Sequence, residues 1–316
     1  MAGRLERHAG PEGNARRSPG GRLRLAWRRS ERLRGYVLLS PTLLVMAILL
    51  GLPLAALLLV SFWTQDYVTL DTSFTLANYA AIFDYAQSPI YLTLLGRSLL
   101  MSAAATAAVI LLAFPIAYFL AFRVTRRKLV WIILITLPFW TSYLLRIFAW
   151  KVILGFNGLI NSGLISLGLI HQPLEFLLYN PTAVTITLAH AWAAYAILPI
   201  YVSLEKIDRS LLEAATDLGD GPLKRFFRIT LPLAAPGTIA ATLLVFIPTV
   251  GDYVTPALVG GTSGVMVGNI IQALFGRMNN APLGAALSVV MMLTVTLLVS
   301  ALLWRGGRRR RSAQGL

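Results

Sequence analysis

The segment Glu213–Gly219 reads EAATDLG, and Ile229–Pro232 reads ITLP, with nine residues between the glycine and the isoleucine. Both segments lie between two apolar runs, Thr182 to Leu204 and Leu233 to about Val259. Each run is long enough to cross a bilayer as a helix. The pattern therefore predicts a helical membrane protein with a structured polar loop on one face of the membrane.

Residue types within this loop predict two short helices joined by a glycine. Ser210 with Glu213 three residues later has the form of a capping box, which predicts a helix start. Gly219 is placed to end that helix, because glycine reaches left-handed backbone angles without steric cost. Pro222 suits the first turn of a second helix, and Pro232 is expected to stop it before the next apolar run.

Composition indicates that the whole chain belongs in a bilayer. Hydrophobic residues make up 57% of the sequence and charged residues 13%, whereas soluble domains are about 25% charged. Crossing a hydrocarbon core of about 30 Å takes about 20 apolar residues in a helix, and backbone groups in lipid must be paired within the segment. We therefore predict an all-α integral membrane protein with six transmembrane helices: Tyr36 to Trp63, Ser98 to Phe122, Leu129 to about Trp150, Thr182 to Leu204, Leu233 to about Val259, and Leu283 to Trp304.

The net charge of +15 follows the predicted topology. Of the 28 Lys and Arg residues, 24 fall before Tyr36, in residues 123–128, in residues 205–232 or after Trp304. Cytoplasmic segments of membrane proteins carry such an excess of basic residues. The pattern predicts cytoplasmic N- and C-termini in a bacterial inner membrane, with anionic lipid headgroups, and not nucleic acid, as the neighbours of the basic residues.

Domain organisation follows from the same pattern. Residues 1–35 are rich in Arg, Gly and Pro, so we expect a mobile basic tail. The apolar run behind them is too long for a signal peptide, and we expect it to be retained as the first helix. Residues 36–304 are expected to form one membrane domain containing the cytoplasmic loop at about 205–232, and residues 305–316 a second basic tail.

Signatures of catalysis are missing from the sequence. It has no Walker-type phosphate loop, no His-Glu-x-x-His helix and no cysteine. The chain is therefore expected to have no catalytic residues, to bind no cofactor or metal, and to draw any transport energy from a partner protein.

Asp252, followed by Tyr253, is the polar group best placed to line a transport pathway. A carboxylate within a membrane-spanning helix should face protein or water, and it would attract a cation. Pro248, Gly251 and Pro256 could open the helix there and free backbone carbonyls. Alternatively, Asp252 lies near the outer interface and only caps or pairs there.

Aromatic residues give a second indication of a pathway. Trp140 and Tyr143 lie in the third span, and Trp192 and Tyr195 share one face of the fourth. Aromatic rings can enclose an ammonium group by cation–π attraction. They also form interfacial belts and ordinary helix packing, so both interpretations stay open. Arg146 is expected to mark the outer end of the third helix or to pair with an acid of a partner, and not to touch a cationic solute.

The spacing of the loop motif closely resembles the cytoplasmic coupling loop of permease subunits in bacterial binding-protein-dependent ABC importers. This resemblance implies a type I importer permease fold. It also implies a cytoplasmic ATPase dimer that binds the ATP, with Glu213 contacting the ATPase and Gly219 permitting the tight turn. The alternative is an ordinary amphipathic loop. All seven positions that define the motif are filled: Glu213, Ala214, Ala215, Gly219, Ile229, Leu231 and Pro232.

Three further segments, Leu137–Arg146, Gly158–Asn161 and Phe246–Pro256, resemble the spermidine/putrescine branch of these permeases. That resemblance implies a polyamine substrate, a second, non-identical permease subunit and an extracytoplasmic substrate-binding protein. Asp252 matches a position where this branch often carries an acid. Relatives that move opines, aminophosphonates or other small, amino-acid-like solutes keep the substrate open. A secondary transporter, a channel or a structural membrane protein would leave the loop motif unexplained.

Overall fold

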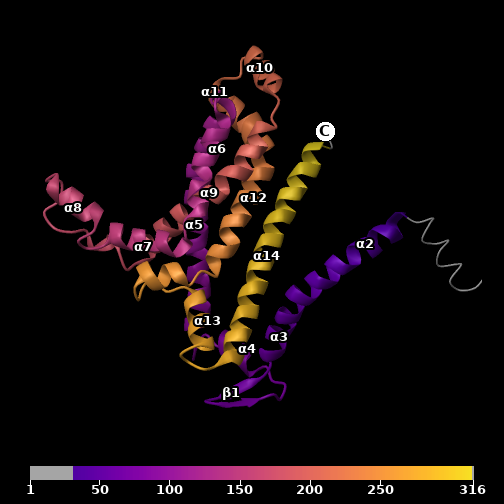
Figure 1. Ribbon diagram of the computed structural model, residues 1–316, viewed down its shortest axis with the longest axis vertical. Coiled ribbons are helices and arrows are strands. Elements are labelled where there is room, and N and C mark those ends of the chain that lie inside the picture. Colours follow the sequence, from indigo (N-terminus) through magenta and orange to yellow (C-terminus); the bar gives the residue numbers. More distant parts are fainter. Residues whose placement is uncertain (1–30, 315–316) are drawn as a thin grey trace, which may run out of the picture. The chain divides into compact units, whose positions relative to one another are not determined.

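A computed structural model describes residues 31–314, which are mostly helical (Figure 1). The chain divides into two compact units, residues 1–56 and 57–316, which are described separately. The elements in chain order are α2 (Glu31–Met46), η1 (Ala47–Gly51), α3 (Leu52–Val60), β1 (Thr64–Asp66), β2 (Thr69–Asp71), α4 (Ala77–Phe83), α5 (Ile90–Phe122), α6 (Lys128–Thr136), η2 (Leu137–Trp140), α7 (Tyr143–Leu154), α8 (Leu159–Ser166), η3 (Glu175–Leu177), α9 (Pro181–Glu205), α10 (Arg209–Asp217), α11 (Pro222–Arg225), η4 (Phe226–Thr230), α12 (Leu231–Val250), η5 (Pro256–Gly260), α13 (Val267–Phe275) and α14 (Ala281–Gln314).

The described part of the chain contains six helices long and apolar enough to cross a membrane, which confirms the predicted number of spans. Their boundaries differ from the predicted ones, most of all in the third and fifth. They are Gly35–Val60, Ile90–Phe122, Tyr143–Ser166, Pro181–Glu205, Pro222–Val250 and Ala281–Trp304.

The first unit consists of α2, η1 and the start of α3. Most of the predicted N-terminal tail, residues 1–30, lies outside the described residues, and α2 begins at Glu31. Pro41 lies inside α2 and has no N–H for the carbonyl of Val37. The hydroxyl of Ser40 donates to that carbonyl at 2.8 Å. The local sequence thus satisfies the acceptor that its own proline leaves unpaired.

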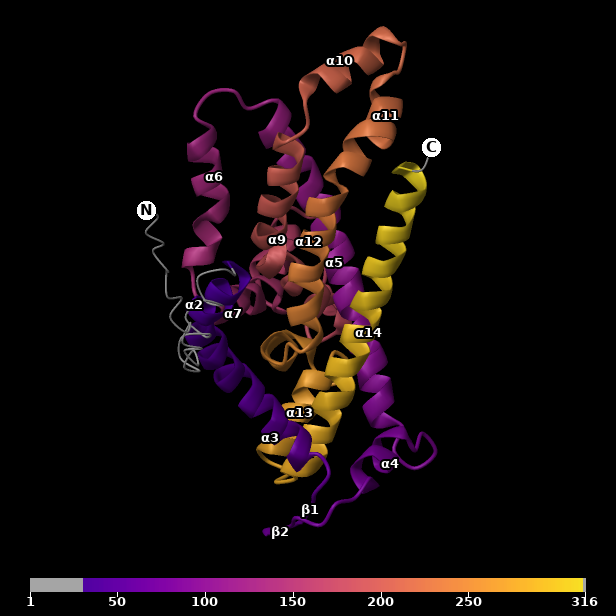
Figure 2. The same cartoon turned by 90° about the vertical axis from the view of Figure 1, so that its right-hand side faces the viewer.

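Three long helices, α5, α9 and α12, pack side by side in the second unit (Figure 2). Gly237 on α12 lies so close to α9 that an added Cβ would approach the Pro199 carbonyl oxygen to 2.2 Å. Small side chains let helix backbones approach closely in a membrane. The three helices share a core that includes seven buried alanines: Ala113, Ala117, Ala121, Ala189, Ala196, Ala234 and Ala241.

Replacing Gly237 with leucine should destabilise the second unit. The leucine side chain has no room against Pro199 and Ser203, and overpacking of this kind typically costs about 1–3 kcal/mol. We expect less protein in the membrane and a melting temperature lowered by several degrees in detergent. Gly96→Leu on α5 is the matched control, because no atom lies within 4 Å of its Cβ position. Equal melting temperatures for the two variants would contradict the close α9–α12 packing.

The third predicted span, Leu129 to about Trp150, is wrong as a single helix. α6 ends at Thr136 and the short η2 contains Pro138. Thr141 and Ser142 then adopt extended backbone angles before α7 begins at Tyr143. The proline removes a donor, and two extended residues cannot continue the helical hydrogen-bond ladder. The apolar pattern alone did not reveal this interruption.

The fifth predicted span also ends earlier than expected. α12 stops at Val250, so Asp252 lies in a non-helical segment before the short η5. The first turn of α13 packs against this segment. An added Cβ at Gly268 would lie 2.6 Å from the carbonyl oxygen of Gly251. The break is therefore held in place by a neighbouring helix.

Candidate functional site

The 205–232 loop begins with a helix that starts earlier than predicted. Asp208 is the N-cap of α10, and its Oδ1 accepts the N–H of Ser210 at 3.0 Å. The predicted capping box of Ser210 and Glu213 is therefore wrong, because an aspartate two residues upstream already satisfies a free donor of the first turn. The shift places Glu213 in the middle of α10 with its side chain exposed. Glu213 is thus accessible to another protein.

Gly219 ends α10, as predicted, with φ at +82°. Its N–H bonds to the Thr216 carbonyl, and the N–H of Asp220 bonds to the Ala215 carbonyl, both at 2.9 Å. This pair of bonds is a Schellman motif, which satisfies the last carbonyls of a helix through a residue with left-handed backbone angles. The turn therefore depends on the conformational freedom of glycine.

The second arm of the loop runs into the membrane without a stop. Gly221 is the N-cap of α11 and Pro222 its first residue, as predicted. The helix continues through the π turn η4 into α12, so the predicted stop at Pro232 is wrong. Proline removes one bond of the α-helical ladder, and the wider π turn beside it absorbs the irregularity. The loop is consequently joined rigidly to the fifth span.

Two sets of polar contacts hold the arms of the loop together. Oδ1 of Asp220 lies 2.5 Å from Nζ of Lys224, and Oδ2 lies 3.6 Å from Nη1 of Arg228. Nη1 of Arg225 donates to the Thr216 hydroxyl at 2.5 Å. The Asp220 side chain is buried while its two cationic partners are exposed. The loop therefore behaves as one unit around Asp220.

The Asp220 contacts predict a response of the loop to acid. The hydrogen bond from Lys224, assisted by the charges of Lys224 and Arg228, holds the pKa of the Asp220 carboxyl below its usual value of 3.8. Because the pKa in the folded state is the lower one, the contacts stabilise the loop above that usual value. Their contribution is lost as the pH falls through the lowered pKa. We expect amide hydrogen exchange at Gly219 and Asp220, corrected for intrinsic rates, to lose protection as the pH falls below 3.8.

Asp220→Asn should show reduced protection at neutral pH and no further loss at low pH. Asp217→Asn is the control, because the exposed Asp217 carboxylate makes no ion pair within the described part of the chain. An acid response in the Asp220→Asn protein equal to that of the wild type would show that another group controls the loop.

The residues of the loop motif differ in how deeply their side chains are buried. Ala215 and Leu231 face the interior, Ile229 is half-buried, and Ala214 and Pro232 are exposed. Besides Glu213, the loop exposes four large apolar side chains to solvent: Leu211, Leu218, Leu223 and Phe227. Exposed apolar side chains beside a charged group are typical of a protein-binding surface. We call these four residues and Glu213 the loop rim.

Asp252 forms the centre of a polar cluster at the end of α12. Its Oδ1 accepts the N–H groups of Val254 at 2.9 Å and Thr255 at 3.4 Å. Its Oδ2 accepts the hydroxyls of Tyr143 and Thr255, each at 2.5 Å. Asp252 therefore caps the turn that follows it and also binds α7. The capping alternative from the sequence is present in the structure, and the pathway role stays a prediction.

Aromatic rings extend this cluster along α9. The rings of Tyr143 and Trp192 are centred 6.2 Å apart, and those of Trp192 and Tyr195 5.0 Å apart. The structure thus brings together three of the predicted aromatic residues beside Asp252. Trp140 is not among them, since its side chain in η2 is 87% exposed. Tyr253 is also exposed, and its backbone carbonyl accepts the Asn269 side chain at 2.8 Å.

Arg146 binds backbone carbonyls in the described structure. Its Nη1 donates to the Ala191 carbonyl at 2.7 Å, and its Nη2 donates to the carbonyls of Pro138 and Thr141. No ion pair within the described part of the chain includes Arg146, and its pairing with an acid of a partner stays a prediction. Arg146 fastens the interrupted third span to α9, one residue before Trp192.

Two residues of the cluster were not assigned a role from the sequence. Thr255 donates to Asp252 and contacts Tyr143, and Asn269 holds the Tyr253 carbonyl. The position of Thr255 three residues after an aspartate is the local signal that could have indicated it. Asn269 offered no such signal, because its partner comes from a separate element.

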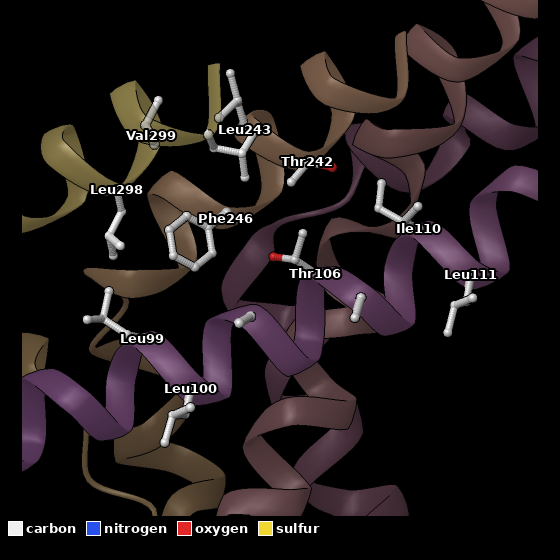
Figure 3. Close-up of a pocket in the computed structure, with 13 residues that line it drawn as sticks. Leu99, Leu100, Thr106, Ile110, Leu111, Thr242, Leu243, Phe246, Leu298 and Val299 are labelled. Atoms are coloured by element: carbon white, nitrogen blue, oxygen red, sulfur yellow. The ribbon is translucent and has the colours of Figure 1, made fainter. Parts of the chain in front are cut away.

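A large apolar hollow lies away from this cluster, between α5, α12 and α14 (Figure 3). It has a volume of about 820 Å³, and its lining includes Leu99, Phe246 and Leu298 but no ionisable side chain. A charged solute would find no compensating charge there, and burying an uncompensated charge is costly. The Asp252 cluster is the better candidate for a polar solute.

Comparison with known families gives this architecture a context. Residues 113–311 match the family described as "Binding-protein-dependent transport system inner membrane component". The matched region covers more than half of the chain, including the loop motif and the Asp252 cluster. The chain belongs to this family. The permease is therefore a multi-pass inner-membrane component of an ABC importer. It is a transport subunit and not an enzyme, because ATP hydrolysis belongs to a separate subunit.

Individual relatives agree with this assignment. The permease is 37% identical to the spermidine/putrescine transport system permease protein PotB of Escherichia coli, over 78% of this chain and 88% of the relative. It is also 37% identical to PotB of Haemophilus influenzae, over 84% and 87%. In fold it resembles a chain of a bacterial ABC transporter for the acidic polysaccharide alginate, with a TM-score of 0.65, 17% identity and coverage of 91% and 99%. The last likeness establishes the fold only.

Proposed function

We propose that the permease forms one half of the membrane pathway of an ABC importer for polyamines. The proposal rests on one observation above all: the Asp252 carboxylate is paired only with neutral donors among the described residues. None of the described ion pairs includes Asp252. Its negative charge therefore attracts a cation, and the neighbouring Tyr143 and Trp192 rings favour an ammonium group. The printed names of the PotB relatives point to the same class of solute.

A polyamine has one feature that suits this arrangement. Each of its amino groups, in the protonated form, can donate hydrogen bonds but cannot accept one. The protein donors around Asp252 are uncharged hydroxyls and backbone N–H groups. An arriving ammonium group would replace the Tyr143 hydroxyl on Oδ2 and form a hydrogen-bonded ion pair, in which the donor is charged as well as the acceptor. The released Tyr143 ring would still lie beside the solute.

Transport is proposed to follow alternating access driven from the 205–232 loop. The loop rim would dock on a cytoplasmic ATPase dimer, and the continuous helix from Pro222 to Val250 would carry the movement to the segment containing Asp252. ATP can shift the equilibrium between two conformations of the transporter only if it binds one of them more tightly than the other. A second, non-identical permease would complete the pathway, and an extracytoplasmic binding protein would deliver the solute.

The test of substrate class is uptake by the complete transporter in proteoliposomes. Radiolabelled spermidine and putrescine should accumulate only under two conditions. ATP must be present on the side of the membrane that carries the ATPase, and the binding protein must be present on the other side. Unlabelled polyamine should compete, whereas an opine or an aminophosphonate should not. Competition by those solutes without competition by polyamines would replace the polyamine assignment with another small solute. ATP-independent accumulation driven by an ion gradient would indicate a secondary transporter.

Membrane orientation gives a separate prediction. We propose that the 205–232 loop and both termini are cytoplasmic and that residues 64–89 lie outside. Because the chain has no cysteine, single cysteines can be introduced without background. In intact cells a membrane-impermeant maleimide should label Val68→Cys but not Leu218→Cys, although both side chains are at least 85% exposed. After permeabilisation both should react. The opposite pattern would invert the topology and remove the ATPase from the loop rim.

The domain organisation is part of the same proposal. Residues 36–304 would form the membrane domain, with basic segments over residues 1–35 and 305–316 on the cytoplasmic side. Of the second basic segment, residues 305–314 continue the helix α14. The basic composition of this segment favours anionic lipid headgroups as its neighbours.

A further inference from the structure

A β-hairpin that the sequence analysis did not predict follows the first span. β1 and β2 pair antiparallel, with Asp66 opposite Thr69, so that Tyr67 and Val68 form the tip. The two tip side chains are 89% and 85% exposed, although both are large and apolar. The hairpin belongs to the segment between the first two candidate spans and therefore lies outside the membrane-crossing helices. Two adjacent, highly exposed apolar side chains are a candidate binding surface for another molecule.

The backbone at the tip is held in an unfavourable conformation. Tyr67 has φ at +53°, which is strained for a bulky residue and is normally left to glycine. Its carbonyl accepts the side-chain amides of Gln65 at 3.2 Å and Asn279 at 2.7 Å. Gln65 in turn accepts the N–H of Ala281 at the start of α14. A strained residue that several groups hold in place is typical of a binding site.

The anchoring makes the tip a fixed feature of the second unit. Asn279 and Ala281 precede or begin the sixth span, more than 200 residues along the chain from the hairpin. Figure 1 shows β1 beside the lower end of α14, at the opposite end of this helix from its C-terminus. The backbone of the tip is therefore held in one position, which reduces the entropy of ordering the hairpin that binding would cost.

Charge around the tip distinguishes between possible partners. Asp66 and Asp71 lie on the two strands, and the sequence has no Lys or Arg from Thr64 to Tyr91. The segment that anchors the tip carries one basic residue, Arg277, two residues before Asn279. The backbone N–H of Ser73 holds the pKa of Asp71 below its usual value, so this carboxylate stays ionised. An acidic surface is repelled by anionic lipid headgroups. The hairpin is therefore suited to a protein with a basic surface and poorly suited to a membrane surface.

We propose that the hairpin tip is a docking site for the extracytoplasmic solute-binding protein of this transporter. The Tyr67 ring inserts into an apolar recess of that protein, and Lys or Arg side chains around the recess face Asp66 and Asp71. Tyrosine is enriched among the residues that dominate binding energy at protein interfaces, and complementary charge speeds encounter. The inference rests on the proposed function, because it requires an importer with such a binding protein.

The decisive variant is Tyr67→Gly. Glycine adopts a φ of +53° without strain, so the hairpin should fold at least as well as in the wild type. Only the ring is lost. With the complete transporter in nanodiscs and its purified binding protein as probe, we expect the Kd to rise at least tenfold. The ATPase activity measured without binding protein should stay unchanged. Asp66→Lys should weaken binding as well and reduce its dependence on salt.

Tyr85→Ala is the matched control, since this exposed tyrosine lies in the same outer segment but away from the hairpin. Binding to Tyr67→Gly as tight as to the wild type would overturn the inference while leaving the importer assignment intact. Uptake by the wild type that needs no binding protein would instead remove the proposed function. Quenching of a bimane label on Tyr67→Cys by brominated lipid would place the tip in the membrane surface and would also overturn the inference.

Discussion

Replacing Gly219 with valine should lower solute uptake at least tenfold while leaving the amount of permease in the membrane unchanged. Gly219 has φ at +82°, and no atom lies within 4 Å of its Cβ position. The substitution therefore causes no clash, and its whole effect comes from the backbone. A left-handed conformation costs an ordinary residue about 1–2 kcal/mol, and more for a β-branched one. That cost corresponds to a fall of roughly 5–30-fold or more in the population of the native turn.

Loss of the turn matters because it sets the angle between α10 and the helix that continues into the fifth span. Without the Schellman bonds of Gly219 and Asp220, the loop rim is no longer held in one position relative to α12. We expect uptake in proteoliposomes to fall at least tenfold, with ATP hydrolysis no longer stimulated by solute-loaded binding protein.

Two controls isolate the backbone effect. Gly219→Asn should retain most uptake, because asparagine tolerates the left-handed region. Gly221→Val should also be close to wild type, since Gly221 has an equally open surrounding and an ordinary φ of −63°. Normal uptake by Gly219→Val, or equal losses in Gly219→Val and Gly221→Val, would contradict a role for the turn in coupling.

Asp252→Asn should lower polyamine uptake at least tenfold without preventing assembly with the ATPase. The amide keeps the size of the side chain, and its oxygen can still cap the following turn through the N–H of Val254. What disappears is the negative charge that a polyamine would meet. Tyr143→Phe should have a smaller effect, because the ring and the charge both remain.

Asp84→Asn is the matched control for Asp252→Asn. Asp84 also caps its own turn, by accepting the N–H groups of Ala86 and Gln87, but it lies in the segment between the first and second candidate spans. Its replacement should leave uptake near the wild-type rate. Unchanged uptake by Asp252→Asn would remove this residue from the pathway and leave only its capping role. A loss of ATPase assembly in that variant would show a structural defect.

The local sequence predicted those features that depend on neighbouring residues. The six apolar runs predicted the number of spans, and the glycine in EAATDLG predicted the left-handed turn at the end of α10. Pro222 was correctly placed in the first turn of α11. Each of these features follows from hydropathy or from the backbone preference of one residue type. None of them depends on a contact with a distant part of the chain.

The incorrect predictions concern places where two local sequence signals favoured different structures. Ser210 with Glu213 formed an acceptable capping box, yet Asp208 offered an equally good cap and took the position. Pro232 was expected to end a helix, but a π turn before it allowed the helix to continue. The apolar character of residues 129–150 concealed the break at Thr141 and Ser142, because hydropathy measures burial preference and not backbone conformation.

By itself, the sequence determined that this protein is a bundle of membrane helices with a glycine-hinged loop, because hydrophobicity and glycine backbone freedom act over a few residues. Only the tertiary structure placed Tyr143 on Asp252, 109 residues away, and Asn279 on the carbonyl of Tyr67, 212 residues away. It also decided that Trp140 lies apart from that cluster. Such pairs depend on how whole helices pack against one another, and side-chain hydrogen bonds form wherever that packing brings a donor to an acceptor.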